Sequence, residues 1–217
     1  MRWIDRLERH IGRWSIPEFP LFIVVANGAI YLLSQVQPAF LSQLLLDPDA
    51  VRAGQWWRIV TFLFVPPFAG SLILLVFWLY LLYTYAHALE QEWGEFQFCF
   101  FYLIGAAATA IAALFIARDT ISNVPLNTTL FLAFATLFPN VELLLFFVLP
   151  VKVKYIAWVL WGMSGVSLVM GSFVTRVAIA ASLLNYLLFF GPELLEALKL
   201  RVQVARNRRR FRSPPTS

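Results

Sequence analysis

The segment "GQWWRIVTFLFVPP", residues 54–67, places two tryptophans and Arg58 between apolar runs. Just before it, Asp47 and Asp49 are suited to cap a short helix, because their carboxylates accept hydrogen bonds from backbone N–H groups. Tryptophan and arginine favour the boundary between lipid and water, since each joins an apolar body to a polar end. We therefore expect this part of the chain to lie half within a membrane, with Trp56, Trp57 and Arg58 at its interface.

The composition predicts an integral membrane protein. The 217 residues are 60% hydrophobic and 13% charged, whereas soluble domains average roughly 45–50% apolar and 25% charged residues. One polytopic domain is the simplest organisation for this length. Cys99 is the single cysteine, so neither a disulfide framework nor a Cys/His metal site is expected, and we interpret Cys99 as a packing residue. No motif for a cofactor or a metal was found.

Six apolar runs are candidate membrane spans, because each approaches the ~20 residues that cross a bilayer as a helix. The fourth run is short for a perpendicular crossing. The candidate spans are residues 19–36, 71–89, 97–117, 125–138, 153–171 and 173–191.

The N-terminal segment, residues 1–17, has the pattern of an amphipathic helix lying in the headgroup plane. Its apolar residues recur at helical spacing between four arginines. An ordinary helical cap packed on protein is the alternative. Pro17 and Pro20 end the helix and turn the chain towards the bilayer.

The distribution of basic residues predicts the orientation. Residues 1–17 and the tail at 194–217 are both basic, which places both termini in the cytoplasm and requires an even number of spans. Lys152 and Lys154 fall on the same side after four crossings. In the absence of a targeting or retention signal, a prokaryotic inner membrane is the expected location.

The net charge of +5 is concentrated in the terminal segments beside the spans. Anionic lipid of the inner leaflet is therefore a better partner than nucleic acid, since each basic residue near such a surface contributes about 1 kcal/mol. A topology signal without further function is the alternative. The proposed lipid-surface residues are Arg208, Arg209, Arg210 and Arg212.

Three motifs in the same order resemble the rhomboid and derlin superfamily. In "GQWWRIVTFLFVPP", Gly54, Trp57 and Arg58 match the signature that opens the first external loop of that superfamily. "HALEQEWG", residues 87–94, resembles the end of its second helix, with Glu90 and Gly94. "ATLFPNVELLLFFVLPVKVKY", residues 135–155, resembles the link into its fifth helix.

The resemblance implies an all-α membrane protein with a six-transmembrane-helix rhomboid-like bundle, residues 18–193, and a membrane-embedded first loop. Proteolytic rhomboids carry Gly-x-Ser-Gly in the fourth helix and a histidine in the sixth. The histidine is needed because a serine hydroxyl is a weak nucleophile without an adjacent base.

"GMSG", residues 162–165, spells this motif around Ser164, but on the fifth candidate span. The fourth span lacks the motif, and the sixth lacks a histidine. His10 lies in the N-terminal helix, and His87 differs from Ser164 in depth by roughly 10 Å or more, against the ~3 Å of proton transfer. Gly162, Ser164, Gly165 and Gly171 are therefore interpreted as positions of close helix approach.

The other polar residues in the spans are expected to hydrogen-bond across helices or to their own carbonyls. A client-binding role is the alternative for four of them: Asn127, Thr128, Ser182 and Asn185. Arg58 and Glu90 suit structural anchoring.

The function that best fits the sequence is that of a non-proteolytic rhomboid-like protein which binds transmembrane helices of client proteins. Catalysis by Ser164 as an intramembrane serine protease is the alternative. A small-solute transporter is a weaker one, because the spans lack the acidic pairs of an ion path.

Overall fold

The computed structural model describes residues 16–37, 39–67, 71–145 and 148–212, and in residues 192–198, 200–202 and 205–212 it describes the helical backbone alone. Residues 1–15 of the expected amphipathic helix and the final residues 213–217 lie outside the described residues.

Each of the six apolar runs forms a helix. In the described part of the chain, five segments are long and apolar enough to cross a membrane: α2 (Phe19–Val36), α6 (Leu72–Trp93), α7 with η3 (Glu95–Ala117), α9 (Val153–Met170) and the first part of α10 (Phe173–Gly191). The remaining one, α8 (Val124–Leu137), has 14 residues. It is about 21 Å long against a hydrocarbon layer of about 30 Å, so it cannot cross the full layer by itself.

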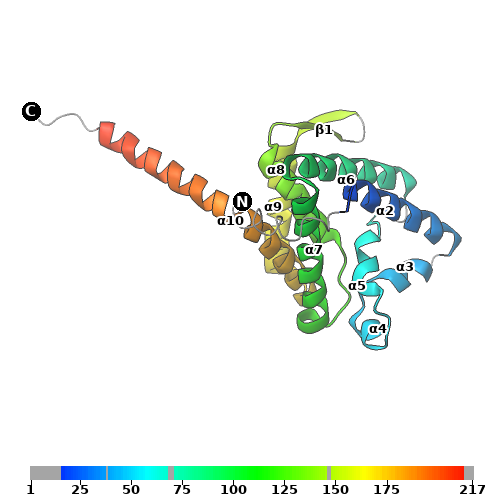
Figure 1. Ribbon diagram of the computed structural model, residues 1–217. Coiled ribbons are helices and arrows are strands. Elements are labelled where there is room, and N and C mark those ends of the chain that lie inside the picture. Colours follow the sequence, from blue (N-terminus) through cyan, green and yellow to red (C-terminus); the bar gives the residue numbers. More distant parts are fainter. Residues whose placement is uncertain (1–15, 38, 68–70, 146–147, 213–217) are drawn as a thin grey trace, which may run out of the picture.

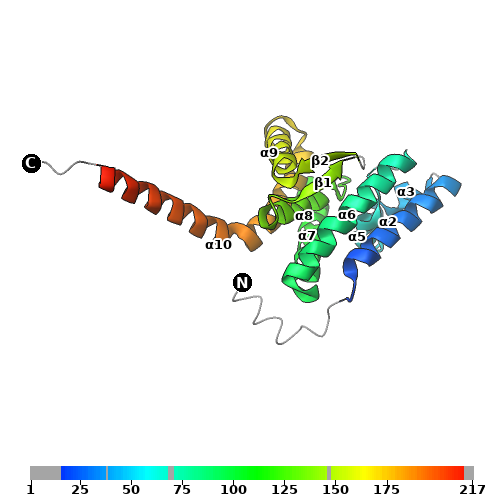
Figure 2. The same cartoon turned by 90° about the horizontal axis from the view of Figure 1, so that it is seen from above.

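The centre of the molecule is formed by α8 and by α7 (Glu95–Ile111), which continues into the π-helical turn η3 (Ala112–Ala117). Helix α10 packs against both, while α6 packs against α8 and α2. Figure 2 shows α7 and α8 between α6 and α10. The buried side chains of this centre include Cys99, which confirms its expected packing role.

The loop between α2 and α6 folds into four short helical pieces: α3 (Ala39–Leu44), α4 (Pro48–Arg52), α5 (Arg58–Thr61) and η2 (Phe62–Phe64). Asp47 caps α4 as expected, because its Oδ1 accepts the N–H groups of Asp49 and Ala50 at 2.9 and 3.3 Å. Asp49 does not cap a helix; it lies inside α4 and pairs with Arg52 at 3.0 Å.

The link between α8 and α9 contains an antiparallel hairpin, β1 (Glu142–Leu145) and β2 (Leu149–Lys152), which the sequence analysis did not predict. Its base is held by Val153 N–H donating to the carbonyl of Val141 at 2.9 Å. The charged residues of the two strands lie only at this base, where Glu142 and Lys152 are opposite each other in the strand register. The side chain of Glu142 is exposed.

Helix α10 runs from Phe173 to Arg212 without a break, so the predicted sixth span and most of the predicted basic tail belong to one helix. Its last part projects away from the other elements (Figures 1 and 2). For the four proposed lipid-surface arginines, which lie there, the structure describes backbone only.

Candidate functional site

Arg58 is a buried anchor of the first loop. Its guanidinium Nη1 donates to the carbonyls of Ser42 and Leu45 at 2.7 and 3.1 Å. Its Nε donates to Gln55 Oε1 at 2.7 Å. The residue is only 7% exposed, and its interactions are those of the expected anchoring role. Its expected placement at the membrane interface stays a prediction.

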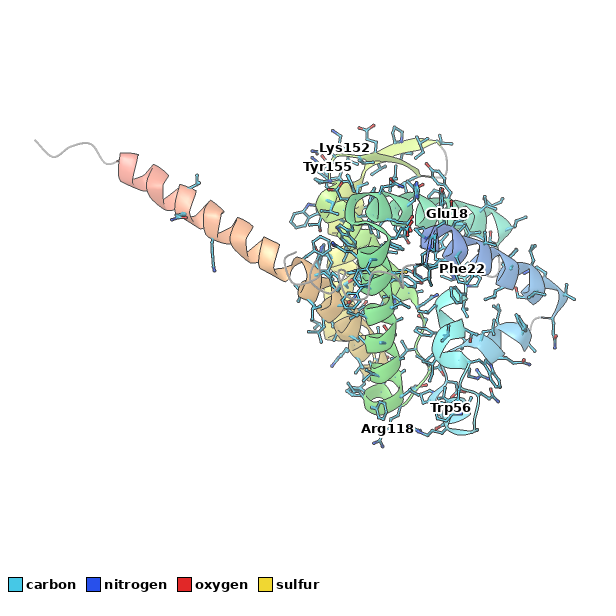
Figure 3. The ribbon with its side chains drawn as sticks, in the orientation of Figure 1. Glu18, Phe22, Trp56, Arg118, Lys152 and Tyr155 are labelled. Carbon is cyan, nitrogen blue, oxygen red and sulfur yellow. The ribbon has the colours of Figure 1, made fainter. Side chains whose placement is uncertain are left out.

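The neighbouring signature residues have different geometries. Gly54 has φ = +100°, a left-handed conformation that a residue with a Cβ adopts only with strain. Trp56 and Trp57 are 66% and 53% exposed. Figure 3 shows Trp56 near one end of the molecule and Lys152 at the other. An exposed pair of indoles at one end suits the expected contact with a membrane interface.

Glu90 and Gly94 shape the opposite end of α6. The Glu90 carboxylate is buried, lies 3.7 Å from His87 Nδ1 and interacts with the backbone N–H of Phe19 at the start of α2. Gly94 has φ = +85°, and its N–H donates to the carbonyl of Glu90 at 2.8 Å. These contacts end α6, turn the chain into α7 and tie α6 to α2.

Ser164 lies beside a cavity of about 500 Å³ between α9, α10 and the link before α8. Several lining side chains carry hydroxyls, including Thr120, Ser122, Ser167 and Thr175. No histidine of the described residues lines it. His87 is stacked on Tyr83 and pairs with Glu90 instead. Among the residues that line this cavity, none has a side chain that could serve as a base for Ser164.

The expected close helix approach at "GMSG" is wrong for two of its glycines. A Cβ added at Gly162 or Gly165 would meet no atom within 4 Å, because both lie on the exposed side of α9. At Gly171 a Cβ would collide with the carbonyl oxygen of Ser167, in the preceding turn of the same helix. That glycine is needed to end α9 rather than to admit a neighbouring helix.

The close approach occurs at Gly105 of α7, which the sequence analysis missed. A Cβ there would collide with Leu126 Cδ1 of α8 and lie 2.7 Å from Asn185 Nδ2 of α10. Asn185 Nδ2 donates across helices to the carbonyl of Phe101 at 3.1 Å. An apolar run with one glycine gives no sign of such a three-helix junction, because the contact depends on residues far apart in the sequence.

The polar residues of the spans divide into satisfied and unsatisfied groups. Thr128 and Thr129 donate to carbonyls of their own helix at 2.9 and 2.8 Å. Ser182 Oγ and the Oδ1 atoms of Asn127 and Asn185 are buried and have no hydrogen-bond partner. The expectation of internal hydrogen bonding thus fails for Ser182 and Asn127.

Asn123, which precedes α8, was also missed. Its Nδ2 donates to the carbonyls of Leu63 and Val65 at 2.9 and 3.0 Å, and its side chain is buried. These two bonds fix the start of α8 against the end of the first loop. A sequence gives little sign of this role, because the partners are 58 and 60 residues away.

A second cavity, of about 450 Å³, lies between α6, α8 and α9 and meets the hairpin at Leu145. Its walls are mainly apolar and aromatic, and no charged residue lines it. Asn127 is in its wall, together with Tyr85 and Trp78. The remaining lining residues are Pro67, Leu74, Phe77, Leu81, Val124, Phe131, Ile156 and Leu160.

The described residues include no group of three or more His, Cys, Asp or Glu side chains that could hold a metal ion. The chemistry that these two cavities offer is therefore packing and neutral hydrogen bonding. Of the two, the cavity at Asn127 combines an apolar wall with an unsatisfied buried acceptor.

Comparison with protein families gives one match: the model of the Der1-like family matches residues 16–196. The matched region includes the first loop, Glu90, both cavities and α8 to the first part of α10. No curated protein matches the chain.

Proposed function

The chain belongs to the Der1-like family, and from this premise we propose that it binds transmembrane helices of client proteins without cleaving them. It is a rhomboid-like, multi-pass integral membrane protein with several apolar helices. The proposal assigns client binding to the cavity between α6, α8 and α9, which is called the lateral cavity below.

The observation that carries the proposal is the lining of the lateral cavity. An apolar helix gains little by leaving lipid, because lipid tails are as apolar as its side chains. It gains from shape and from hydrogen bonds, and the lateral cavity offers aromatic walls with the amide of Asn127. A cavity of about 450 Å³ has room for several side chains of a helix lying against its mouth.

The absence of cleavage is supported by the surroundings of Ser164. A serine protease needs a base at hydrogen-bond distance from the nucleophile. Ser164 faces a different cavity, and His87 is held beside Glu90. Treatment of the purified protein with a fluorophosphonate serine probe tests the protease alternative, with Ser164→Ala as the control.

A photocrosslinking experiment tests client binding. A photoreactive amino acid replaces Leu160, which lines the lateral cavity, or Val159, the preceding residue of α9, which is 61% exposed and outside the lining. Each variant is reconstituted in liposomes with a tagged single-span leucine-rich helix. We expect about fivefold more adduct from position 160. Equal yields from the two positions would contradict the proposal.

We also propose that both termini are cytoplasmic and that the basic end of α10 contacts anionic lipid. The lipid contact is supported by the attraction between basic side chains and an anionic surface. In a Cys99→Ala background, a cysteine introduced as Ser217→Cys should react with an impermeant maleimide in inside-out vesicles and resist it in sealed right-side-out vesicles. The reverse pattern would overturn the orientation. The prokaryotic inner membrane stays a prediction.

A further inference from the structure

Asn127 is the exception among the polar residues of α8. Its side chain is 6% exposed, lines the lateral cavity and has an Oδ1 atom without a partner. The adjacent Thr128 and Thr129 satisfy their hydroxyls on carbonyls of the same helix. Among these three consecutive residues of α8, the unsatisfied acceptor is therefore on the one that lines the cavity.

The length of α8 places this acceptor deep in the bilayer. Asn127 lies ten residues before Leu137, the last residue of α8, which corresponds to about 15 Å along the helix. The charged base of the hairpin follows that end and suits the interface. Since the hydrocarbon layer is about 30 Å thick, Asn127 lies near its middle.

An unsatisfied amide at this depth costs free energy that lipid cannot recover. Acyl chains have no hydrogen-bond donors, and the walls around Asn127 are mainly apolar. A water molecule is stable in such a place only with two to four polar partners. A helix that brings a donor to the lateral cavity removes this cost.

Resting on the client-binding function proposed above, we infer that the lateral cavity selects client helices that carry a neutral hydrogen-bonding side chain near the middle of their span. Asn127 is the specificity-determining residue. Glutamine and asparagine suit it best, because their amides both donate to Oδ1 and accept from Nδ2; serine and threonine supply one donor. Charged side chains are disfavoured, because no charged residue lines the cavity to pair with them.

A host–guest series tests the inference with the full-length protein in liposomes. The host is a single-span polyleucine helix, and the guest is glutamine at its central residue or, as a register control, near one end. The affinity of each host helix for the protein is measured by energy transfer from a label on the helix. For the wild-type protein we expect the central glutamine to bind about threefold to tenfold more tightly than leucine, and the terminal glutamine to bind like leucine.

Three variants connect the preference to Asn127. Asn127→Leu should abolish the preference, so that hosts with central glutamine and central leucine bind with the same affinity. Asn127→Val should do the same, because its aliphatic side chain has no hydrogen-bonding atom. Thr128→Val, which alters the next residue but not the lining, should keep the full preference.

The outcomes separate this inference from the function on which it rests. If no host binds the wild type, client binding itself fails. If the polyleucine host binds but central glutamine gives no gain, or if the gain persists in Asn127→Val, the inference is overturned. If Asn127→Leu does not fold, the smaller Asn127→Val decides between these results.

Discussion

Helices α8 and α9 are neighbours of similar composition, yet they have opposite roles in this molecule. Helix α9 carries the Gly-x-Ser-Gly motif at residues 162–165. However, its only buried side chain is that of its first residue, Val153. Helix α8 has no such motif, is short and contributes nine buried residues, among them Asn127. The comparison teaches that a sequence motif does not show which polar residue a membrane bundle buries.

The two helices also begin differently. The start of α8 is fixed by Asn123, whose amide reaches two carbonyls of the first loop. The start of α9 follows the hairpin, and its N-cap Lys152 makes no side-chain hydrogen bond to it. The α8 region is thus tied to distant parts of the chain, whereas α9 is held mainly by its neighbours in sequence and by packing on α8 and α10.

The largest effect is expected at two glycines, Gly105 of α7, where α8 packs closely, and Gly165 of α9. Gly105→Val inserts a side chain between Leu126 and Asn185 and should lower the free energy of unfolding by about 3 kcal/mol, as overpacking of a core does. In the matched variant Gly165→Val on α9, the new side chain would extend into open space. This variant should change the free energy of unfolding by less than about 0.5 kcal/mol. Unfolding in mixed micelles measures both, and equal losses would refute the contrast.

A smaller effect is expected where the helices begin. Asn123→Ala leaves the buried carbonyls of Leu63 and Val65 without this partner and should lower the free energy of unfolding by about 2 kcal/mol. Lys152→Ala should leave it within about 0.5 kcal/mol of the wild type. The same unfolding measurement applies. A loss for Lys152→Ala as large as that for Asn123→Ala would show that α9 is anchored by a contact of comparable strength.

The smallest effect is expected at Ser164. Ser164→Ala removes a half-buried hydroxyl on α9 and should change the free energy of unfolding by less than about 0.5 kcal/mol. A fluorophosphonate should label neither the wild-type protein nor the Ser164→Ala variant, because no base lines the cavity beside this serine in the described structure. If the wild type is labelled and the Ser164→Ala variant is not, the protease alternative is restored. The functional residue would then lie on α9 and not on α8.

Much of the helical arrangement could be predicted from particular residues. The apolar runs gave all six helices to within a few residues at most ends, and Asp47 was recognised as a cap because capping depends on the next few residues alone. The hairpin at Glu142–Lys152 was missed, since its strands have no alternation of polar and apolar residues that would mark them. The continuation of α10 to Arg212 was missed for a similar reason, because charge distribution marks a membrane boundary and does not end a helix.

The residues of the candidate site also differ in how far the sequence could predict their roles. Asn127 could be named from the sequence as one of several polar residues in a span, and Ser164 could be set aside because no base accompanies it. Which polar residue stays unsatisfied could not be predicted, since Thr128, Thr129 and Asn127 are consecutive and differ only in what surrounds them. The roles of Gly105 and Asn123 likewise depend on partners from other helices and loops.

The sequence by itself determined that this chain enters a membrane, where its helices begin and which family signature it carries, because apolar run length, capping and motif order are local properties. Only the tertiary structure decided that α8 is central, that Arg58 is buried, that "GMSG" lies on an exposed face and that Asn127 faces an apolar cavity without a partner. The physical reason is that burial and hydrogen-bond satisfaction depend on which segments meet in space. In this chain Phe101 and Asn185, which share a hydrogen bond, are separated by 84 positions.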